Sequence, residues 1–318
     1  MGQQGTGAGA LVVSAAPAAL ALLEPLLQAH RRRRSVHVAS GAIDGPLLQT
    51  AAAALCIGGA GATPGRALPG PFLTRPDGSN VPVGWLPDAG ARLAVYARAA
   101  ADVQDRRPSE TGAGPYLLLG EFDDRALHTV ARMQERMPRG AGVYRWTSER
   151  IPRNGLIEAL GDGAAAAFYV GHGLAGGWVG YGGFGVAAAA EAARDPLGAV
   201  LSLSCSTAAR PRSGYSFCEE LALTGLCAAA FGAVSRTLHR HNVALALDLA
   251  ATLADDPCPT LASLLLACAW PRDLVERYRI IGDPLAPLLA APAAASAARA
   301  VFAPGPDDRL PVVSLADW

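Results

Sequence analysis

Two side chains that could do covalent chemistry each stand at the end of a short apolar segment. His172 lies in Phe168-Tyr169-Val170-Gly171-His172-Gly173, and Cys205 ends Val200-Leu201-Ser202-Leu203-Ser204-Cys205. A free thiol is only slightly ionised at neutral pH, and a neighbouring imidazole raises its reactivity as a nucleophile. If the two segments lie side by side, His172 would be the general base and Cys205 the nucleophile of a cysteine hydrolase.

Both segments are predicted to be short buried strands. Aromatic and β-branched residues interrupted by glycine are typical of a parallel strand that stops at the carboxyl edge of an α/β sheet, where ligand sites form. The backbone N–H groups of Gly173 and Cys205 are the predicted oxyanion donors, because a glycine after the histidine lets the main chain approach a tetrahedral intermediate closely. Taken singly, each residue has a simpler explanation, His172 as a satisfied strand-end histidine and Cys205 as a buried core thiol. Taken together, their order along the chain favours the catalytic pair.

Two further candidates belong to the same predicted edge. Glu121 directly follows a strand predicted at Tyr116 to Gly120, so its carboxylate could orient the imidazole as the third member of a nucleophile–base system. Trp178 lies in the glycine-dense segment 176–185, which lacks the Gly-Lys-Ser/Thr ending of a phosphate loop. This segment is predicted to form a flexible wall of the cleft, with Trp178, Tyr181 and Phe184 contacting the substrate.

Elements that alternate between strand and helix would position these residues. The first half is predicted to contain strands at 10–14, 36–40, 55–57 and 81–86 and helices at 17–29, 47–54 and 89–104, with a long loop from 58 to 80. After a polar, proline-containing linker, strands are predicted at 116–119, 142–146 and 228–234, besides the two strands that carry His172 and Cys205. Helices are predicted at 125–136, 154–160, 216–225, 242–254 and 260–269. This rhythm predicts an α/β fold with a mostly parallel sheet flanked by helices.

This pattern predicts that the chain is divided into four parts. Residues 1–9 are predicted to be a flexible N-terminus, residues 10–108 a smaller α/β subdomain, residues 109–289 the catalytic subdomain, and residues 290–318 an Ala/Pro-rich tail.

Five segments, in order along the chain, resemble the gingipain family of caspase-like cysteine peptidases. They are Val83-Gly84-Trp85-Leu86-Pro87, Tyr169-Val170-Gly171-His172-Gly173 with Trp178 downstream, Ser204-Cys205, Phe217-Cys218-Glu219-Glu220-Leu221 and Ile280-Ile281-Gly282-Asp283-Pro284-Leu285. The resemblance, which runs from about Leu11 to Leu288, implies a caspase-like fold and a caspase-like cysteine protease, related to caspases, separases and bacterial CHAT-type proteases. It also supports His172 and Cys205 as the catalytic pair and Glu121 as the orienting glutamate.

The resemblance further implies a substrate-binding aspartate at the start of the helix predicted at 125–136. Asp124 is the first candidate and Asp123 the second, and either would select Arg or Lys before the scissile bond, since a desolvated carboxylate needs a cationic partner. The alternative is that both are helix-capping and first-turn acids, which the helix dipole favours at that position.

Composition excludes some other classes. Lys plus Arg and Asp plus Glu are both 27, and a net charge of zero gives no support to bulk electrostatic binding of nucleic acid or membrane. The six cysteines show neither a CxxC pair nor zinc spacing, and no segment reads as a signal peptide or a membrane span. We therefore expect a cytoplasmic protein without metal or cofactor.

These observations together predict a cysteine endopeptidase that forms an acyl-enzyme and cleaves a protein or peptide substrate after Arg or Lys. A regulatory protein on a separate chain is a further expectation. Two alternatives remain open: a non-catalytic adaptor that keeps the fold, and a cysteine hydrolase or transferase acting on a non-peptide acyl substrate with the same dyad.

Overall fold

The computed structural model describes residues 9–39, 43, 45–58, 70–108, 114–138, 142–255, 260–270, 272–292 and 294. Most of the predicted flexible start and of the predicted tail therefore lies outside the described residues. The first residues of that tail pack against the body: Ala290 and Ala291 are buried, and the N–H of Ala291 donates to the carbonyl of Gly163 at 2.7 Å.

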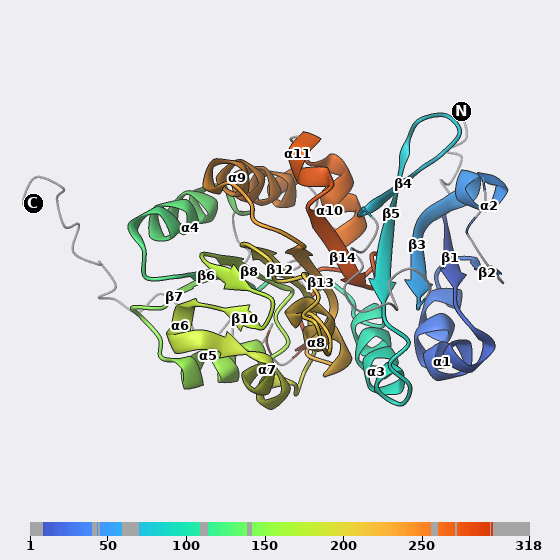
Figure 1. Cartoon of the computed structure of the whole chain (residues 1–318), viewed down its shortest axis with the longest axis horizontal. Coiled ribbons are helices and arrows are strands. Elements are labelled where there is room, and N and C mark those ends of the chain that lie inside the picture. The colour runs from blue at the N-terminus through green and yellow to red at the C-terminus, as the bar shows by residue number, and fades with distance from the viewer. Residues whose placement is uncertain are drawn as a thin grey trace, which may run out of the picture.

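A single large sheet runs through the molecule, with helices on both of its faces (Figure 1). The strand order is β2 (Val36–Ala39), β1 (Ala10–Ser14), β3 (Ala51–Ile57), β5 (Asn80–Leu86), β14 (Tyr278–Gly282), β13 (Cys227–Ala233), β12 (Leu197–Leu203), β8 (Ala166–Val170), β6 (Tyr116–Gly120) and β7 (Val143–Thr147). Neighbouring strands are parallel except β13 and β14, and a short strand β4 (Phe72–Thr74) pairs antiparallel with β5. The predicted α/β fold with a mostly parallel sheet is confirmed.

The helices divide between the two faces of the sheet (Figure 1). One face carries α1 (Pro17–Arg31), α3 (Arg92–Gln104), α5 (Arg153–Leu160), α7 (Val186–Ala192) and α8 (Phe217–Leu223). The other carries α4 (Asp124–Arg136), α9 (His239–Asp255), α10 (Leu261–Ala267) and α11 (Arg272–Val275). Because helices cover both faces, the central strands are buried on both sides. This explains why β8 and β12 read as continuous apolar runs rather than as alternating ones.

The two predicted subdomains share this sheet through the pairing of β5 with β14. A Cβ added at Gly84 in β5 would lie 1.9 Å from the carbonyl oxygen of Gly282, so only glycine permits this approach. The sheet is thus continuous from the N-terminal half to the catalytic half, and the subdomain boundary near residue 108 stays a prediction.

A buried polar cluster joins the same two halves. Asp283, predicted to be a turn residue, accepts a hydrogen bond from the N–H of Leu285 at 2.9 Å, as a turn residue would. Its other oxygen lies 3.0 Å from Nε2 of His30 in α1 and 2.7 Å from Nε2 of Gln104 in α3. All three side chains are fully buried. The closing Gly-Asp-Pro segment therefore anchors two N-terminal helices in addition to making a turn.

Two segments differ from their predictions. Within the loop predicted from 58 to 80, residues Phe72–Thr74 form strand β4. The predicted helix at 47–54 is wrong in its second half, because α2 (Gly45–Thr50) ends at Thr50 and β3 begins at Ala51. Alanine favours a helix by intrinsic propensity, but here the segment is enclosed between β1 and β5, and pairing on both sides outweighs that preference.

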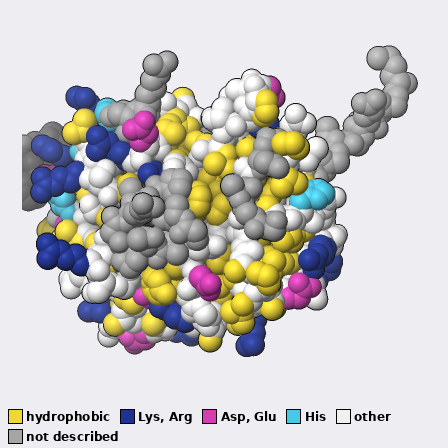
Figure 2. All heavy atoms as spheres, turned by 45° about the vertical axis from the view of Figure 1, so that its right-hand side comes forward, with side chains coloured by type: hydrophobic (Ala, Val, Ile, Leu, Met, Phe, Trp, Pro, Cys, Tyr) yellow, Lys and Arg dark blue, Asp and Glu magenta, His cyan; other side chains and the backbone are white. Residues whose placement is uncertain are grey.

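The surface agrees with the balanced composition. Figure 2 shows basic and acidic side chains scattered mainly around the margin of one face, with hydrophobic side chains gathered between them. Among the described residues, no helix is long and apolar enough to span a membrane.

Candidate active site

His172 and Cys205 come from adjacent strands at the same edge of the sheet. Strands β8 and β12 are parallel and pair Val170 with Leu203, and each candidate lies two residues beyond its paired position. The following residue confirms how closely the two chain segments approach, because a Cβ added at Gly173 would lie 2.5 Å from the carbonyl oxygen of Cys205. His172 is exposed and Cys205 is half-buried, so both are open to a substrate at this edge.

Cys205 differs from the other described cysteines in exposure. Cys56, Cys218, Cys227 and Cys268 are all buried, and burial raises the pKa of each thiol, to about 12 for Cys56, Cys218 and Cys268. A buried thiol with a raised pKa stays protonated at neutral pH and is a poor nucleophile. Within the described part of the chain, Cys205 is therefore the one cysteine that a substrate can reach.

Glu121 reaches His172 through the main chain. It follows β6, the neighbour of β8 on the side away from β12, and its Oε2 accepts a hydrogen bond from the backbone N–H of His172 at 2.6 Å. A Cβ added at Gly171 would lie 2.7 Å from Cβ of Glu121, so the glycine allows the two segments to meet. The carboxylate thus fixes the backbone that carries the imidazole, and its predicted role toward the ring itself stays a prediction.

A small hairpin completes the support of His172. Strands β9 (Gly173–Leu174) and β10 (Gly177–Trp178) pair antiparallel, and the backbone N–H of Val179 donates to the carbonyl of His172 at 3.0 Å. The hydroxyl of Tyr169 donates to the same carbonyl at 2.9 Å. In this register Gly173 faces Trp178 as a non-hydrogen-bonded pair, which leaves the N–H of Gly173 outside the hairpin ladder. That N–H has the freedom that an oxyanion donor needs.

The predicted contact of Trp178 with the substrate is wrong. Trp178 is 2% exposed, donates its indole N–H to Ser202 at 2.9 Å, and stacks on Tyr169 with ring centroids 4.5 Å apart. Phe184, with no exposed surface, stacks on its other side. The sequence pattern was correct in placing these aromatic residues near the histidine. They form a small core beneath the hairpin rather than the wall of a cleft, because each indole or phenyl ring is stabilised more by burial among the others than by exposure.

Three residues that sequence reasoning missed form a chain of hydrogen bonds behind the cysteine. The backbone N–H of Thr237 lies 3.4 Å from Sγ of Cys205, and its hydroxyl lies 3.6 Å from the same sulfur. The amide nitrogen of Asn242 donates to that hydroxyl at 2.8 Å, and the phenol of Tyr278 donates to Oδ1 of Asn242 at 3.1 Å. Asn242 and Tyr278 are buried.

The pKa of Tyr278 is influenced by the same neighbours, Cys205 and Thr237. Burial raises the pKa of Tyr278, the nearby Cys205 raises it further, and a hydrogen bond with Thr237 opposes the increase. Tyr278 is the first residue of β14 and pairs with Ala233, so it reaches the edge where Cys205 lies. Only the antiparallel pairing of β14 puts it there, and the spacing of residues along the chain carries no signal for it.

The two candidate aspartates have different surroundings. Asp123 is the N-cap of α4, and its Oδ1 accepts from the N–H groups of Arg125 and Ala126 at 3.0 and 3.3 Å. Asp124 is exposed in the first turn and has no hydrogen-bond or ion-pair partner among the described residues. The helix-cap interpretation therefore fits Asp123, whereas the carboxylate of Asp124 is uncommitted.

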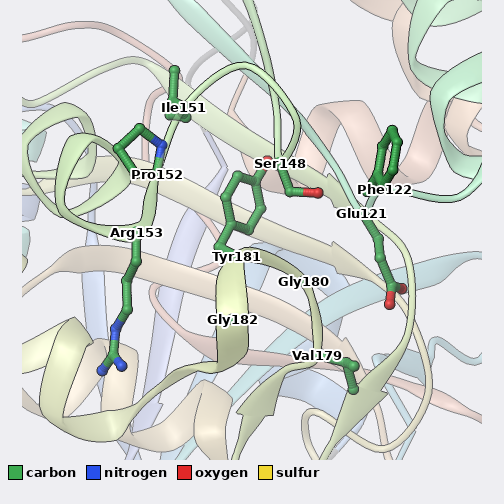
Figure 3. Close-up of a pocket in the computed structure, with 10 residues that line it drawn as sticks. All are labelled: Glu121, Phe122, Ser148, Ile151, Pro152, Arg153, Val179, Gly180, Tyr181 and Gly182. Carbon is green, nitrogen blue, oxygen red and sulfur yellow. The ribbon is translucent and has the colours of Figure 1, made fainter.

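An open cavity of about 340 Å³ is lined in part by Glu121 (Figure 3). Its lining comes from the segments after β6 and β7 and from the segment after β10: Glu121, Phe122, Ser148, Ile151, Pro152, Arg153, Val179, Gly180, Tyr181 and Gly182. In the described residues no group of three or more His, Cys, Asp or Glu side chains could hold a metal ion.

The chain matches the model of peptidase family C25 over residues 120–289, which is more than half of its length. It resembles the crystal structure of the Arg-specific cysteine proteinase gingipain R (RgpB) with 13% identity and a TM-score of 0.66, covering 91% of this chain and 79% of that one. The complex of Porphyromonas gingivalis RgpB pro- and mature domains gives 12% identity, a TM-score of 0.65, and coverage of 88% and 79%.

A further solved protease structure gives 13% identity and a TM-score of 0.66, with coverage of 87% of this chain and 78% of that one. At such identities the likeness establishes the fold, which is caspase-like. A search of curated proteins finds no match.

Proposed function

Because the chain belongs to peptidase family C25, we propose that it is a cysteine endopeptidase that cleaves peptide bonds with Cys205 as nucleophile and His172 as general base. The single observation that carries this proposal is the shared register of the two residues. Each lies two positions past a paired residue on adjacent parallel strands, and Gly173 packs against the main chain of Cys205.

The reaction follows from this geometry. His172 takes the thiol proton as Sγ of Cys205 attacks the peptide carbonyl, and the N–H groups of Gly173 and Cys205 donate to the oxyanion that forms. When the C–N bond breaks, the imidazolium returns the proton to the leaving amine and a thioester remains. His172 then takes a proton from water, whose hydroxide attacks the thioester, and the thiol recovers that proton as the acid is released.

Glu121 is assigned to positioning. Its hydrogen bond to the N–H of His172 fixes the backbone at the histidine, and the carboxylate favours the imidazolium that forms during the reaction. Glu121 and His172 come from neighbouring strands, so this contact depends on the pairing of β6 with β8.

Specificity for Arg or Lys before the scissile bond is proposed to reside in Asp124. Two observations support this choice over Asp123. The carboxylate of Asp124 is exposed and has no hydrogen-bond partner among the described residues, whereas the carboxylate of Asp123 accepts the hydrogen bonds that cap α4. A cationic substrate side chain would supply the partner that Asp124 lacks.

The specificity is tested with peptide reporters that end in Arg, Lys, Asp or Leu. Asp124→Ala is expected to lower the Arg-to-Leu ratio of kcat/KM by at least tenfold, and its melting temperature should stay close to that of the parent. Asp123→Ala should instead cost about 1 kcal/mol of stability as a lost helix cap and leave the ratio unchanged. An unchanged ratio in both variants would withdraw the preference for basic residues.

The catalytic base is tested with His172→Ala. Because His172 supplies both thiol activation and the proton for the leaving amine, kcat is expected to fall by a factor of about 10² to 10⁴. A variant that keeps more than a tenth of the parent rate would mean that another residue is the base. Turnover of thioesters or esters without any peptide cleavage would favour the non-peptide acyl substrate instead.

A protein substrate and a regulator on a separate chain complete the proposal. The cytoplasmic location rests on the cysteine content and stays a prediction.

A further inference from the structure

The main chain adopts a strained conformation directly after Cys205. Ser206 has a φ of 59°, in the left-handed region, and among the described non-glycine residues only Tyr181 shares a positive φ. In this region Cβ crowds the following carbonyl oxygen, so residues other than Gly, Asn and Asp rarely adopt it. Glycine supplies the positive φ at the eleven other described positions, which makes Ser206 an exception in this chain. Strained residues of this kind cluster at active sites.

The turn at Ser206 sends the following residues into the protein. Thr207 has no exposed surface and Ala208 is 1% exposed, whereas Cys205 is half-buried. The chain therefore leaves the nucleophile toward the core, and the thiol stays open to a substrate. An ordinary negative φ at Ser206 would carry the following residues in another direction, because rotation about this bond moves everything after it.

Hydrogen bonds fix the turn on the side of β13. The N–H of Ser206 donates to the carbonyl of Ser235 at 3.2 Å, and the N–H of Ala208 donates to the carbonyl of Ala233 at 2.8 Å. The N–H of Ala209 donates back to the carbonyl of Ser206 at 2.9 Å. A strained backbone persists only where its surroundings over-determine it, and these three bonds do so here.

A buried ion pair holds the far end of the same segment. Nε of Arg210 donates to Oε1 of Glu219 in α8 at 2.9 Å, and the two side chains are 5% and 0% exposed. The other carboxylate oxygen of Glu219 accepts from the N–H of Ser216 at 2.8 Å. Both ends of the loop between Arg210 and Ser216 are thus fixed to one carboxylate, so the chain beyond Ser206 has little freedom to relieve the strain.

The turn decides which backbone groups at the nucleophile stay free. Ser235 belongs to the chain after β13 and Gly173 to the chain after β8, and these strands flank β12 on opposite sides. The N–H of Ser206 is taken by Ser235, whereas the N–H of Cys205 has no acceptor among the described residues. The segment that holds the turn also holds the sulfur, because the N–H of Thr237 lies 3.4 Å from Sγ of Cys205. The peptide after Cys205 is thus fixed, and the peptide before it is left for an oxyanion.

We propose that Ser206 is a positioning residue for Cys205: its left-handed turn keeps the N–H of Cys205 available to the oxyanion and the sulfur beside Thr237. This role rests on the proposed function of Cys205 and His172 and adds the main-chain conformation on which that function depends. The backbone of Ser206 carries the role, since its hydroxyl has no hydrogen-bond partner in the described part of the chain.

Substitutions at Ser206 that differ in their tolerance of a positive φ test this role. The branched Cβ of valine excludes it from the left-handed region, so Ser206→Val is expected to lower kcat at least about tenfold, where complete loss of an oxyanion donor costs about 10² to 10³. Glycine and asparagine adopt this region readily, so Ser206→Gly and Ser206→Asn should keep kcat within about twofold of the parent. Rates are expressed per active site titrated with an irreversible peptidyl inhibitor, so unfolded protein does not contribute.

Two peptide ligands separate positioning from a general loss of structure. A peptide aldehyde forms a tetrahedral adduct with Cys205, and its oxygen takes the oxyanion position. Its affinity should fall in Ser206→Val by about the same factor as kcat/KM. A peptide of the same sequence with a reduced scissile bond forms no adduct and should bind with parental affinity.

Ser213→Val is the matched control. It makes the same replacement at an exposed serine of the following loop, where φ is not positive, and it should match the parent in kcat and in aldehyde affinity. A parental kcat in Ser206→Val would overturn the positioning role. An equal loss in Ser206→Gly would also overturn it, because the side chain rather than the backbone would then carry the effect.

The same assays separate the two proposals. Cleavage that depends on Cys205 but ignores the residue at position 206 would leave the proposed function standing without a role for Ser206. Cleavage that persists in Cys205→Ala would remove the proposed function, and the positioning role with it.

Discussion

At the scale of single residues, the orientation of hydrogen bonds behind Cys205 determines what the sulfur meets. The amide of Asn242 is fixed, because its nitrogen faces the carbonyl of Leu203 and the hydroxyl of Thr237, and its oxygen accepts from Tyr278. Thr237 therefore accepts from Asn242 and keeps its own hydrogen to donate. An ionised sulfur is a stronger acceptor than the neutral phenol oxygen of Tyr278, so Thr237 would donate both its hydroxyl and its backbone N–H to a thiolate.

Thr237→Val is expected to make Cys205 less reactive. The variant loses the hydroxyl donor but keeps the backbone donor, so the rate constant of iodoacetamide alkylation at neutral pH should fall about tenfold, equivalent to ~1.4 kcal/mol. Thr237→Ser should restore the parental rate constant. Thr224→Val, which removes a half-buried hydroxyl at the C-cap of α8 that bonds Leu221, is the matched control and should leave the rate constant unchanged. A parental rate constant in Thr237→Val would show that the hydroxyl plays only a packing role.

Sequence reasoning found the two reactive residues but not this support. His172 and Cys205 follow apolar strands, and that pattern is visible along the chain. Thr237 and Tyr278 lie 32 and 73 residues beyond Cys205 in the numbering. Thr237 meets it because β13 pairs parallel with β12, and Tyr278 because β14 pairs antiparallel with β13. Trp178 was misplaced for a related reason: residue type shows that it packs near the histidine, but which side of the hairpin it occupies depends on the register of β9 and β10.

At the scale of elements, buried hydrogen bonds to Asp283, which follows β14, link helices α1 and α3 to the catalytic half of the sheet. Burial by itself would raise the pKa of Asp283, yet the charge of His30 and the hydrogen bonds from His30, Gln104 and Leu285 outweigh it and hold the pKa below its ordinary value. A carboxyl with a lowered pKa stabilises the folded state while it is ionised. Its contribution is fully present above the ordinary value of 3.8 and is lost as the pH falls through the lower folded value.

Asp283→Asn is expected to lower the free energy of unfolding by about 3 to 5 kcal/mol at neutral pH, since it leaves a buried histidine without its charged partner. Urea denaturation of the parent and the variant should show a constant difference above the ordinary Asp range and a shrinking one below it. A difference that stays the same on both sides of that range would mean that ionisation of Asp283 does not carry the effect.

Most elements were predictable because their apolar patterns are long and end at clear turn residues. The exceptions are short. The helix predicted at 47–54 was cut at Thr50 by strand pairing, and the hairpin at 173–178 has two-residue strands that no periodicity can reveal. Strand order was also beyond the sequence, since β5 and β14 are nearly 200 residues apart along the chain and become neighbours only in the sheet.

At the scale of the whole molecule, the pairing of β5 with β14, here called the seam, joins the N-terminal half of the sheet to the catalytic half. Beside the strand pairing, Tyr96 in α3 donates to the carbonyl of Ala228 at 3.1 Å, and Arg106 donates to the carbonyl of Leu289 at 2.8 Å. Because Tyr278 begins β14, distortion at the seam would reach the residues behind Cys205 as well as the core.

Gly84→Ala tests this coupling. The added Cβ would lie 1.9 Å from the carbonyl of Gly282, and relief requires the two strands to separate, at a cost of about 3 kcal/mol. Both the melting temperature and kcat are expected to fall. Gly70→Ala is the control, since its added Cβ meets nothing within 4 Å, and it should resemble the parent in both measurements. A Gly84→Ala variant with parental stability and rate would contradict the role of the seam.

In the proposed reaction, Cys205, activated by His172, forms the covalent intermediate. The most direct measurement is peptide mapping by mass spectrometry after reaction with a peptidyl acyloxymethyl ketone, which alkylates the nucleophile of a cysteine peptidase. We expect one adduct per chain at Cys205, which is absent in Cys205→Ala and forms much more slowly in His172→Ala. Stoichiometric labelling of Cys218 or Cys227 in the folded parent, or undiminished labelling of Cys205→Ala, would contradict it.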